Sequence, residues 1–396
     1  MTLMPVADVQ ARIVSGVEPL AAETVSIFEA AGRVLAEDLT AKLTQPPFAA
    51  SAMDGYAVRA ADMAAVPARL TVIGRSAAGH GFGGEVTAGE AVRIFTGAPV
   101  PVGADTIAIQ ENTRAIGEGA VEIQERAPVG QYVRPQGYDF SEGEILLAAG
   151  TKLTSRELML AAAMNHATAP VRRKPIVAVL ANGDELVQPG QPPGESQIIS
   201  SIPAGMNAAI AAWGGDPLLL DLARDSKESL AARVRDAQKA DVLLTIGGAS
   251  VGEHDLVRGT LEDMGARFDV LKVAMRPGKP VMFGFLGKQR VLSMPGNPAS
   301  AIICARVFLK PLLDRFLGRC GGKEGRDVPL AIAVEANGER EHYMRAHLSQ
   351  TGVAPIGDQD SSLMNAFAKA DCLLVRPARG PALEAGALVK VIPLDF

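Results

Sequence analysis

The sequence predicts a multidomain α/β plus β fold: a doubly wound, largely parallel α/β domain, an inserted small β domain, a helical segment and a C-terminal β-barrel. Three observations lead to this prediction, namely the length of 396 residues, the change in hydrophobic periodicity along the chain, and the Gly- and Pro-rich breaks between periodic stretches. A chain of this length exceeds one ordinary core, so two to four domains of roughly 100 to 150 residues each are expected.

The opening segment has the apolar spacing of amphipathic helices, including a second stretch over Val25 to Ala31. Another helical stretch follows much later, from Thr154 to Asn165. We expect these to form one helical unit, residues 1–41 plus 140–173, that packs on another body. Residues 42–139 then form the inserted β domain, because their short β-favouring runs are separated by Gly and Pro. These runs are Leu70–Ile73, Ala91–Phe95, Thr106–Gln110 and Ala120–Gln124.

Residues 174–320 alternate between strand and helix patterns, which predicts the α/β domain, with ligands at the carboxyl ends of its parallel strands. After the Gly-rich break at Gly318 to Gly325, residues 326–396 return to alternating patterns, and we expect the barrel there. Strands are expected at 176–180, 218–222, 242–246, 281–285, 291–294, 330–334 and 387–392, and helices near 204–213, 226–239, 255–264 and 298–317.

Composition excludes several classes of function. The net charge of −5 gives no basic footprint for nucleic acid. The N-terminus lacks the pattern of a secretory signal, and no run of about 18 apolar residues is present, so we expect a soluble cytoplasmic protein with no membrane partner. The cysteines Cys304, Cys320 and Cys372 lack CxxC spacing, which supports neither a zinc site nor a thiol nucleophile.

A glycine loop at 247–252 lies between a strand and a helix, where backbone amides can approach a phosphate. A simple tight turn explains it about equally well. The loop also fits the G-x-S-x-G nucleophile elbow of hydrolases, with Ser250 as the nucleophile. That remote alternative needs a later histidine, and only His342 and His347 follow His254.

Two other loops end strands of the same sheet. Asn297 and Pro298 begin the last helix of the domain, and helix capping alone explains both residues unless this helix start also binds an anion. The cations Lys272, Arg276 and Lys279 surround a rigid Pro-Gly turn. Surface solvation is the usual role of such residues, but their place at the ligand edge favours binding of a dianion.

Acidic residues follow several of these strands, among them Glu185, Asp225 and Asp255. Two carboxylates about 4 Å apart repel by roughly 4 kcal/mol at an effective dielectric near 20, so convergence predicts a cation such as Mg²⁺. Asp225 also fits a capping box with Glu228. By local rules Asp54 occupies only a turn. The charged residues near Arg345 are of the kind expected on the exposed face of a strand.

Six motifs occur in a fixed order over nearly the whole chain: SAMDGYAV at 51–58, TGAPVPVGAD at 96–105, GDELV at 183–187, GGASVGEHD at 247–255, MRPGKP at 275–280 and MPGNPASA at 294–301. Together these motifs resemble the MoeA and gephyrin E-domain family. The resemblance implies an elongated homodimer of four-domain subunits, with a helical dimerisation segment and an α/β domain of the molybdopterin-binding type. It implies an active cleft between the α/β domain of one subunit and the barrel of the other.

The implied function is a Mg²⁺-dependent transferase that inserts molybdenum from molybdate into adenylylated molybdopterin and releases AMP, acting with other cofactor-synthesis proteins and molybdoenzyme apoproteins. A non-catalytic molybdopterin carrier or scaffold is the alternative. Relative to the family pattern, this chain has Arg276 where Lys is frequent and Asp360 where Gly is frequent. The implied catalytic residues are Asp54, Asp139, Glu185, Asp225, Asp255, Lys272 and Arg276, with Glu185, Asp225 and Asp255 as metal ligands. The implied substrate-binding residues are Gly247, Gly248, Ser250, Gly252, Lys279, Pro295, Gly296, Asn297, Arg345 and Ser362.

Overall fold

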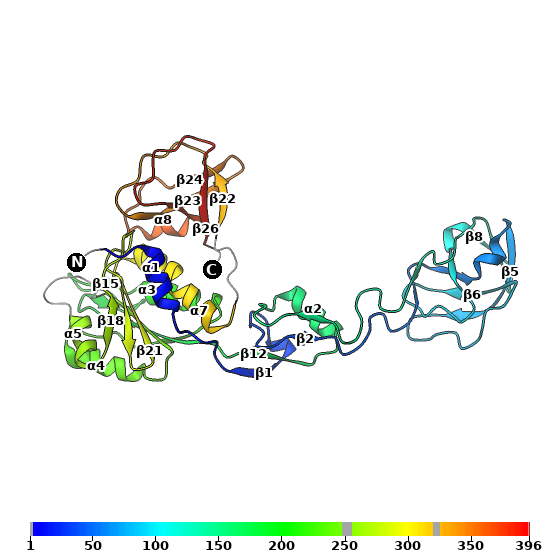
Figure 1. The fold of residues 1–396 in the computed structure, drawn as a ribbon, viewed down its shortest axis with the longest axis horizontal. Coiled ribbons are helices and arrows are strands. Elements are labelled where there is room, and N and C mark those ends of the chain that lie inside the picture. Colours follow the sequence, from blue (N-terminus) through cyan, green and yellow to red (C-terminus); the bar gives the residue numbers. More distant parts are fainter. Residues whose placement is uncertain (1–2, 248–255, 320–324, 395) are drawn as a thin grey trace.

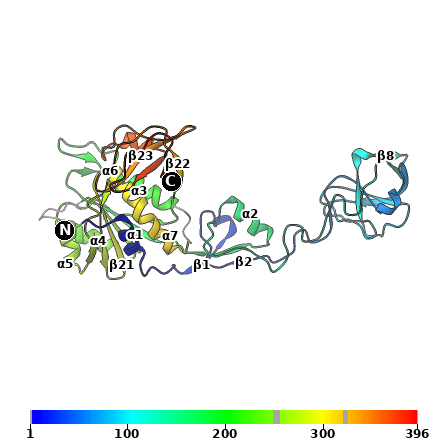
Figure 2. The ribbon, with the colours of Figure 1, turned by 45° about the horizontal axis from the view of Figure 1, so that its top comes forward.

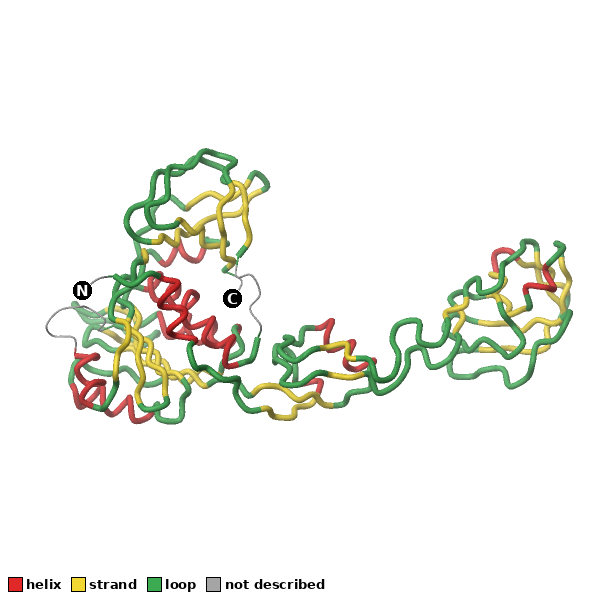
Figure 3. Tube along the Cα trace, in the orientation of Figure 1, coloured by secondary structure: helices red, strands yellow, loops and turns green. Residues whose placement is uncertain are grey.

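A computed structural model describes residues 3–247, 256–319, 325–394 and 396. The chain forms an extended molecule (Figure 1). The α/β unit and the C-terminal sheet lie at one end, a small unit built on β1 and β12 lies in the middle, and the inserted β unit lies at the other end. The tube view shows two long stretches of loop that join the inserted β unit to the middle unit (Figure 3).

The α/β unit is built on a six-stranded sheet, which confirms the doubly wound, largely parallel prediction. Four strands are parallel and two antiparallel strands extend one edge. In sheet order the strands are β16 (Asp216–Leu219), β13 (Ile176–Ala181), β17 (Val242–Ile246), β21 (Gln289–Met294), β20 (Met282–Leu286) and β18 (Arg267–Val270).

Helices cover both faces of this sheet, because successive side chains of a strand point to opposite faces. Val177 and Val179 of β13 belong to a core with one group of helices, whereas Ala178 and Leu180 belong to a core with the other group. The first group is α3 (Ile202–Ala212), α6 (Pro298–Cys304) and α7 (Lys310–Phe316), the last two joined by a π-helical segment at Ala305–Leu309. The second group is α4 (Lys227–Asp236) and α5 (Leu256–Asp263) (Figure 1).

The opening segment differs from the sequence prediction. Helix α1 (Val6–Val14) packs in the core of the α/β unit rather than with the middle unit. The second predicted helix is wrong, since residues 22–26 form strand β1 (Ala22–Ser26), followed by a 3-10 turn, η1 (Ile27–Glu29). β1 pairs in antiparallel register with β12 (Thr168–Arg172), so a tertiary partner overrides the local helical spacing.

The middle unit keeps one predicted helix. Helix α2 (Ser155–Ala163) begins with a capping box in which Thr154 and Glu157 satisfy each other's backbone amides. Its core includes Leu153, Ala161 and Val171. This unit is therefore a mixed α and β body rather than the purely helical one expected.

The inserted unit contains a mixed six-stranded sheet with a hydrophobic core on each face. The four predicted strands are all present, and its strands in sheet order are β7 (Thr106–Ile109), β4 (Gly55–Val58), β6 (Glu90–Ile94), β5 (Ala68–Ser76), β9 (Ala120–Ile123) and β8 (Thr113–Ile116). At its base β3 (Ala50–Ser51) pairs with β10 (Val133–Arg134), next to the two connecting segments.

The C-terminal unit is a mostly antiparallel sheet that begins inside the α/β unit, because β19 (Met275–Arg276) pairs with β23 (Glu341–Ser349). The strand expected at 330–334 is wrong, since β22 ends at Pro329 and only single bridges follow at Leu330 and Val334. Closure into a barrel stays a prediction. The remaining strands are β25 (Cys372–Arg376), β26 (Leu388–Pro393), β22 (Arg326–Pro329) and β24 (Gly352–Pro355). A second view places this sheet over α6 and α3 (Figure 2).

Within the described ranges, no helix has both the length and the apolar character that crossing a membrane requires.

Candidate functional site

Acidic and amide side chains meet at the carboxyl ends of β13 and β16. Asn182 directly follows β13, is 7% exposed, and donates from Nδ2 to Asp225 Oδ1 at 3.3 Å. The Asp225 backbone amide lies 3.3 Å from Asp184 Oδ1. The Asn182 carbonyl oxygen Oδ1 is buried without a hydrogen-bond partner in the described part of the chain. This edge therefore presents oxygen ligands, as the strand-end argument predicts.

Gly247 lies against this group because it ends the neighbouring strand β17. Its φ is +92°, and a Cβ here would lie 3.0 Å from the Asn182 backbone oxygen, so only glycine fits. A Cβ on Gly296 would lie 3.6 Å from the Gly247 Cα atom. The acidic group, Gly247 and the start of α6 are thus neighbours. The predicted residues Gly248, Ser250, Gly252 and Asp255 lie outside the described residues.

A pocket of about 330 Å³ opens on the same edge, between the Pro-Gly turn after β19, the start of α6 and a loop of the C-terminal unit. It unites predicted residues that are far apart in sequence, including Arg276, Lys279 and Asn297. Arg340, Ser300 and Ser361 also line it, although they were not among the predicted site residues. The complete lining is Arg276, Pro277, Gly278, Lys279, Pro280, Pro295, Asn297, Ser300, Arg340, Gln359, Asp360 and Ser361.

Asn297 occupies the N-cap position of α6, but its side chain makes no capping hydrogen bond. Its amide Nδ2 instead donates to Ser361 Oγ at 2.8 Å, and the Ala299 backbone amide donates to the Ser361 carbonyl at 3.1 Å. The capping interpretation is therefore wrong for the side chain. Asn297 ties the α/β unit to the C-terminal loop of the same chain, so one chain forms both walls of this pocket.

Arg340 lies just before β23, and its guanidinium donates to the Met275 carbonyl at 3.2 Å. The pairing of β19 with β23 sets Arg276 opposite His342. Burial lowers the pKa of the His342 imidazole to about 4, and four guanidinium groups add to this effect, those of Arg276, Arg340, Arg376 and Arg345. At pH 7 His342 is therefore neutral and adds no positive charge beside these arginines, two of which line the pocket. The positive charge of Arg340, next to a strand, was the signal that sequence reasoning could have used.

Arg345 does not line the pocket, contrary to the prediction that it binds substrate. Only 1% of it is exposed, and its guanidinium donates to the Asp358 and Leu363 carbonyls, both at 3.0 Å. Arg345 therefore fixes the loop that carries Asp360 and Ser361. Ser362 is exposed, and its backbone amide and hydroxyl both donate to Asp360 Oδ1. These bonds lower the pKa of the Asp360 carboxyl and keep it ionised.

Other predicted residues are more scattered. Lys272 is half-buried and is absent from the pocket lining, and its carbonyl accepts from the Met4 amide. Glu185 is exposed next to Gly183, beside the acidic group. No group of three His, Cys, Asp or Glu side chains within the described ranges has the arrangement of a metal site. The predicted set of Glu185, Asp225 and Asp255 is incomplete there because its third member lies outside those ranges.

Asp54 directly precedes β4 of the inserted unit, and Asp139 follows β10 of the same unit. The inserted unit lies at the other end of the molecule from the α/β unit that carries the pocket (Figures 1 and 2). Asp54 Oδ1 accepts from the Thr96 backbone amide at 2.7 Å and from its hydroxyl at 2.8 Å. These bonds lower the pKa of the Asp54 carboxyl, with a smaller contribution from the charge of Arg93. Asp139 lines a groove of about 550 Å³ between the connecting segments. A single chain therefore holds these acids apart from the cationic pocket.

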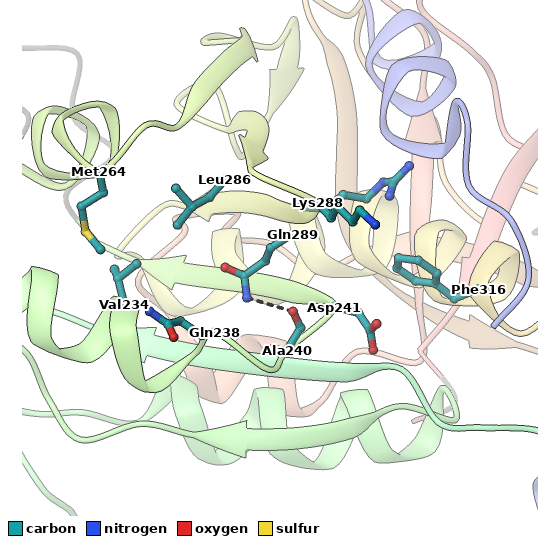
Figure 4. A pocket seen from close by; sticks show the side chains of 10 residues that line it. Val234, Gln238, Ala240, Asp241, Met264, Leu286, Lys288, Gln289 and Phe316 are labelled. Carbon is teal, nitrogen blue, oxygen red and sulfur yellow. Dashed lines mark hydrogen bonds between the residues drawn. The ribbon is translucent and has the colours of Figure 1, made fainter. Parts of the chain in front are cut away.

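A third hollow, of about 380 Å³, lies at the opposite edge of the α/β sheet, where β17 and β21 begin (Figure 4). Gln289 uses its amide to donate to the Ala237 and Ala240 carbonyls, at 2.7 and 2.9 Å. Asp241 is paired with Arg173 at 2.7 Å. These polar side chains already have partners, and the hollow is at the edge away from the strand carboxyl ends, so we assign it no ligand.

Three family models match the chain in order. Residues 4–165 match the MoeA N-terminal region (domain I and II), residues 178–315 match a probable molybdopterin binding domain, and residues 327–394 match the MoeA C-terminal region (domain IV). The fold is similar to a solved structure of a molybdopterin biosynthesis MoeA protein from Pyrococcus horikosii, with a TM-score of 0.83, 31% identity and 100% of both chains covered.

Curated relatives agree with these matches. The chain is 33% identical to a molybdopterin molybdenumtransferase from Haemophilus influenzae, with 95% of each protein covered. It is 35% identical to the enzyme of the same name from Synechococcus elongatus, with 94% of each covered. The six ordered motifs, the α/β fold and these relatives lead to one conclusion: the chain belongs to the MoeA family of molybdopterin molybdenumtransferases.

Proposed function

We propose that this protein inserts molybdenum from molybdate into adenylylated molybdopterin, with release of AMP, to form the molybdenum cofactor. The observation that carries the proposal is the cationic pocket on the carboxyl edge of the α/β sheet, next to a group of carboxylates. The names of the relatives, molybdopterin molybdenumtransferase, support the same reaction. The cytoplasm is the compartment we expect, because the buried thiols Cys304 and Cys372 are free.

The pocket is built to hold an oxyanion. Arg276 and Lys279 project from a Pro-Gly turn, and Arg340 approaches from the C-terminal unit. Cations fixed on stiff backbone stabilise an anion without the cost of reorganising flexible side chains. Asn297 and Ser361 supply neutral polar groups beside them. We assign this pocket molybdate, which is a dianion near neutral pH, or the diphosphate that links the pterin to adenosine, which carries two negative charges in total.

The carboxylate group supports a role for Mg²⁺. Asp225 and Asp184 offer hard oxygen ligands, and the buried Asn182 Oδ1 lacks a partner among the described residues. This donor set fits Mg²⁺, which prefers oxygen and retains several waters. Glu185, Asp225 and Asp255 would hold the ion. When bound, Mg²⁺ would neutralise the phosphoanhydride oxygens, while the chain's own cations orient the anionic groups.

The active form that we propose is a homodimer. Asp54 and Asp139 stand at the far end of an extended chain, so they complete the pocket only if a second subunit supplies them. The middle unit carries the exposed apolar side chains of Phe28 and Met159, which are 95% and 74% exposed. Such large apolar groups on a small unit are typical of an interface. We propose that this unit pairs across a two-fold axis.

The cleft that we propose differs from the one that the resemblance implied. The C-terminal loop that faces the α/β unit belongs to the same chain, as the hydrogen bond from Asn297 to Ser361 shows. The second subunit would instead contribute the base of its inserted β unit.

Purified protein incubated with adenylylated molybdopterin, molybdate and Mg²⁺ tests the proposal. We expect release of AMP together with molybdenum bound to the pterin. Omission of molybdate or of Mg²⁺ provides the control. Tight binding of the pterin without AMP release would instead support a carrier or scaffold. The remote hydrolase alternative gains no support from the described residues, because burial and neighbouring arginines lower the pKa of His342 to about 4 and His347 does not line the pocket.

A further inference from the structure

We propose that the groove at the base of the inserted β unit binds the adenylate half of the substrate and retains it as AMP. This inference rests on the proposed function, since it assigns a place to the nucleotide that the reaction releases. Among the described residues, neither the acidic group nor the cationic pocket at the α/β edge includes an aromatic side chain on which a purine could stack. The groove does, and it is lined by Gln45, Pro46, Pro47, Phe48, Ala50, Gly97, Arg134, Tyr138 and Asp139.

The size and lining of the groove suit a nucleotide. Its volume of about 550 Å³ falls within the range of roughly 300–1,000 Å³ that is usual for small-molecule sites. Phe48 is 40% exposed and Tyr138 is 68% exposed, so both rings present apolar faces to solvent. A purine ring that stacks on such a face gains about 1–3 kcal/mol per base. The prolines at 46 and 47 add rigid apolar wall.

The polar groups of the groove match the two ends of an adenylate. Arg134 is exposed, and no carboxylate lies within ion-pair distance of it among the residues that the structure describes. A free guanidinium is suited to a phosphate. Asp139 is also exposed, and its carboxylate is available to accept from the exocyclic amine of adenine. In this proposal, Arg134 and Asp139 within an apolar lining set the orientation of the bound nucleotide and its preference for adenine.

The backbone holds the two walls in a fixed relation. The Asp139 amide donates to the Gln45 carbonyl at 3.0 Å, and the Gly137 amide donates to the Pro46 carbonyl at 3.0 Å. Arg134 is paired with Ala50 in the register of β10 and β3. The groove is thus formed before any ligand arrives. Gly97, at its rim, directly follows Thr96, whose hydroxyl and amide hold the Asp54 carboxylate.

Calorimetric titration of the full chain with AMP tests this assignment without molybdenum or pterin. We expect saturable binding that weakens at least about tenfold in Arg134→Ala, because a charge-assisted contact with phosphate is lost. Adenosine should bind equally to wild type and to Arg134→Ala. Phe48→Ala should weaken both ligands. Arg126→Ala is the matched control, since Arg126 is an exposed arginine of the same unit outside the groove, and it should bind AMP as wild type does.

Base recognition gives a second readout. IMP carries a carbonyl in place of the 6-amino group, so wild type should prefer AMP, and Asp139→Asn should reduce that preference. No saturable AMP binding up to about 5 mM would overturn the proposal. Equal AMP affinity in wild type and Phe48→Ala would overturn it as well. If a pterin monophosphate binds and Phe48→Ala abolishes that binding but not AMP binding, the groove belongs to the pterin half instead.

The outcomes separate this inference from the function it rests on. If the protein inserts molybdenum but Phe48→Ala and Arg134→Ala leave its affinity for AMP unchanged, the proposed function stands and the adenylate site is rejected. If the protein binds AMP in the groove but does not insert molybdenum, only the proposed function is rejected. The thermal midpoint of each variant should match wild type, because all the substituted side chains are exposed.

Discussion

The cationic pocket and the distal groove have opposite designs. The pocket gathers Arg276, Lys279 and Arg340 from two units that touch within one chain, and it presents positive charge on a rigid turn. The groove gathers residues of the two connecting segments, and it presents aromatic rings with one charge of each sign. The first is suited to small oxyanions, and the second is suited to a flat heterocycle.

The distance between the two regions is equally instructive. Both contain residues that the family resemblance marks for one site, yet the β1–β12 unit lies between them in the chain (Figure 1). Local contacts complete each region by itself, and in the homodimer that we propose a second subunit would bring the two regions together. A reaction that uses both regions therefore couples catalysis to dimerisation.

Mixing variants of the two regions should give the largest effect. Asp54→Ala and Arg276→Ala should each reduce molybdenum insertion by roughly 10- to 100-fold, since each removes a charged contact. Random assembly of the two variant chains yields half mixed dimers with one intact site of two, so about a quarter of wild-type activity should return. AMP release by co-purified mixtures measures this recovery.

The control for this experiment pairs Arg276→Ala with Lys279→Ala, both in the pocket of one chain. That mixture should recover no activity, because every dimer site then lacks one of the two cations. Recovery in this control, or none in the first mixture, would show that the two regions act in separate sites.

Arg345→Ala should act on stability rather than on chemistry. Its guanidinium is buried and bonded to two carbonyls, so its removal leaves buried acceptors without partners and opens a cavity. We expect a loss of about 1–3 kcal/mol in the stability of the C-terminal unit for each buried carbonyl left without a partner. Denaturant unfolding followed by hydrogen exchange of β23 and β25 measures it. If Arg345→Ala is as stable as wild type but inserts molybdenum poorly, Arg345 would instead be a substrate-binding residue.

The pH response of His342 probes the arginines behind the pocket. Its pKa of about 4 lies below the ordinary value of 6.5, so the folded state binds fewer protons than the unfolded state between these values. Stability should therefore fall as the pH drops from about 6.5 towards 4. NMR titration of the imidazole should show a neutral ring down to about pH 4, and Arg340→Ala should raise that pKa. A midpoint near 6.5 in wild type would contradict the buried, cation-rich setting.

Asn297→Ala should give the smallest effect. The variant loses one neutral hydrogen bond to Ser361, worth about 1 kcal/mol, while α6 keeps its Pro298 start. We expect a KM for molybdate raised by less than about tenfold and little change in kcat. Asn297→Asp is the informative companion, because an anion at this position should impair molybdate binding more than the alanine does.

Many elements could be predicted from local pattern. β17 matches its predicted range, residue for residue, because a short apolar run after Asp241 and before Gly247 leaves little choice. The helix predicted from Thr154 begins at Ser155, with Thr154 as its N-cap. The strand at 22–26 could not be predicted in this way, because its partner, β12, lies far along the chain and local spacing favoured a helix.

The same distinction between local pattern and long-range contacts applies to the candidate site. The sequence by itself determined the α/β alternation, the positions of Gly247, Arg276 and Asn297 at strand ends, and thus the ligand edge, since these follow from short-range periodicity and turn chemistry. Only the tertiary structure decided which charges face a ligand. Arg276 and Arg345 look alike in sequence, but strand register exposes the first and buries the second under its own loop. Long-range packing, which no local pattern encodes, makes that distinction.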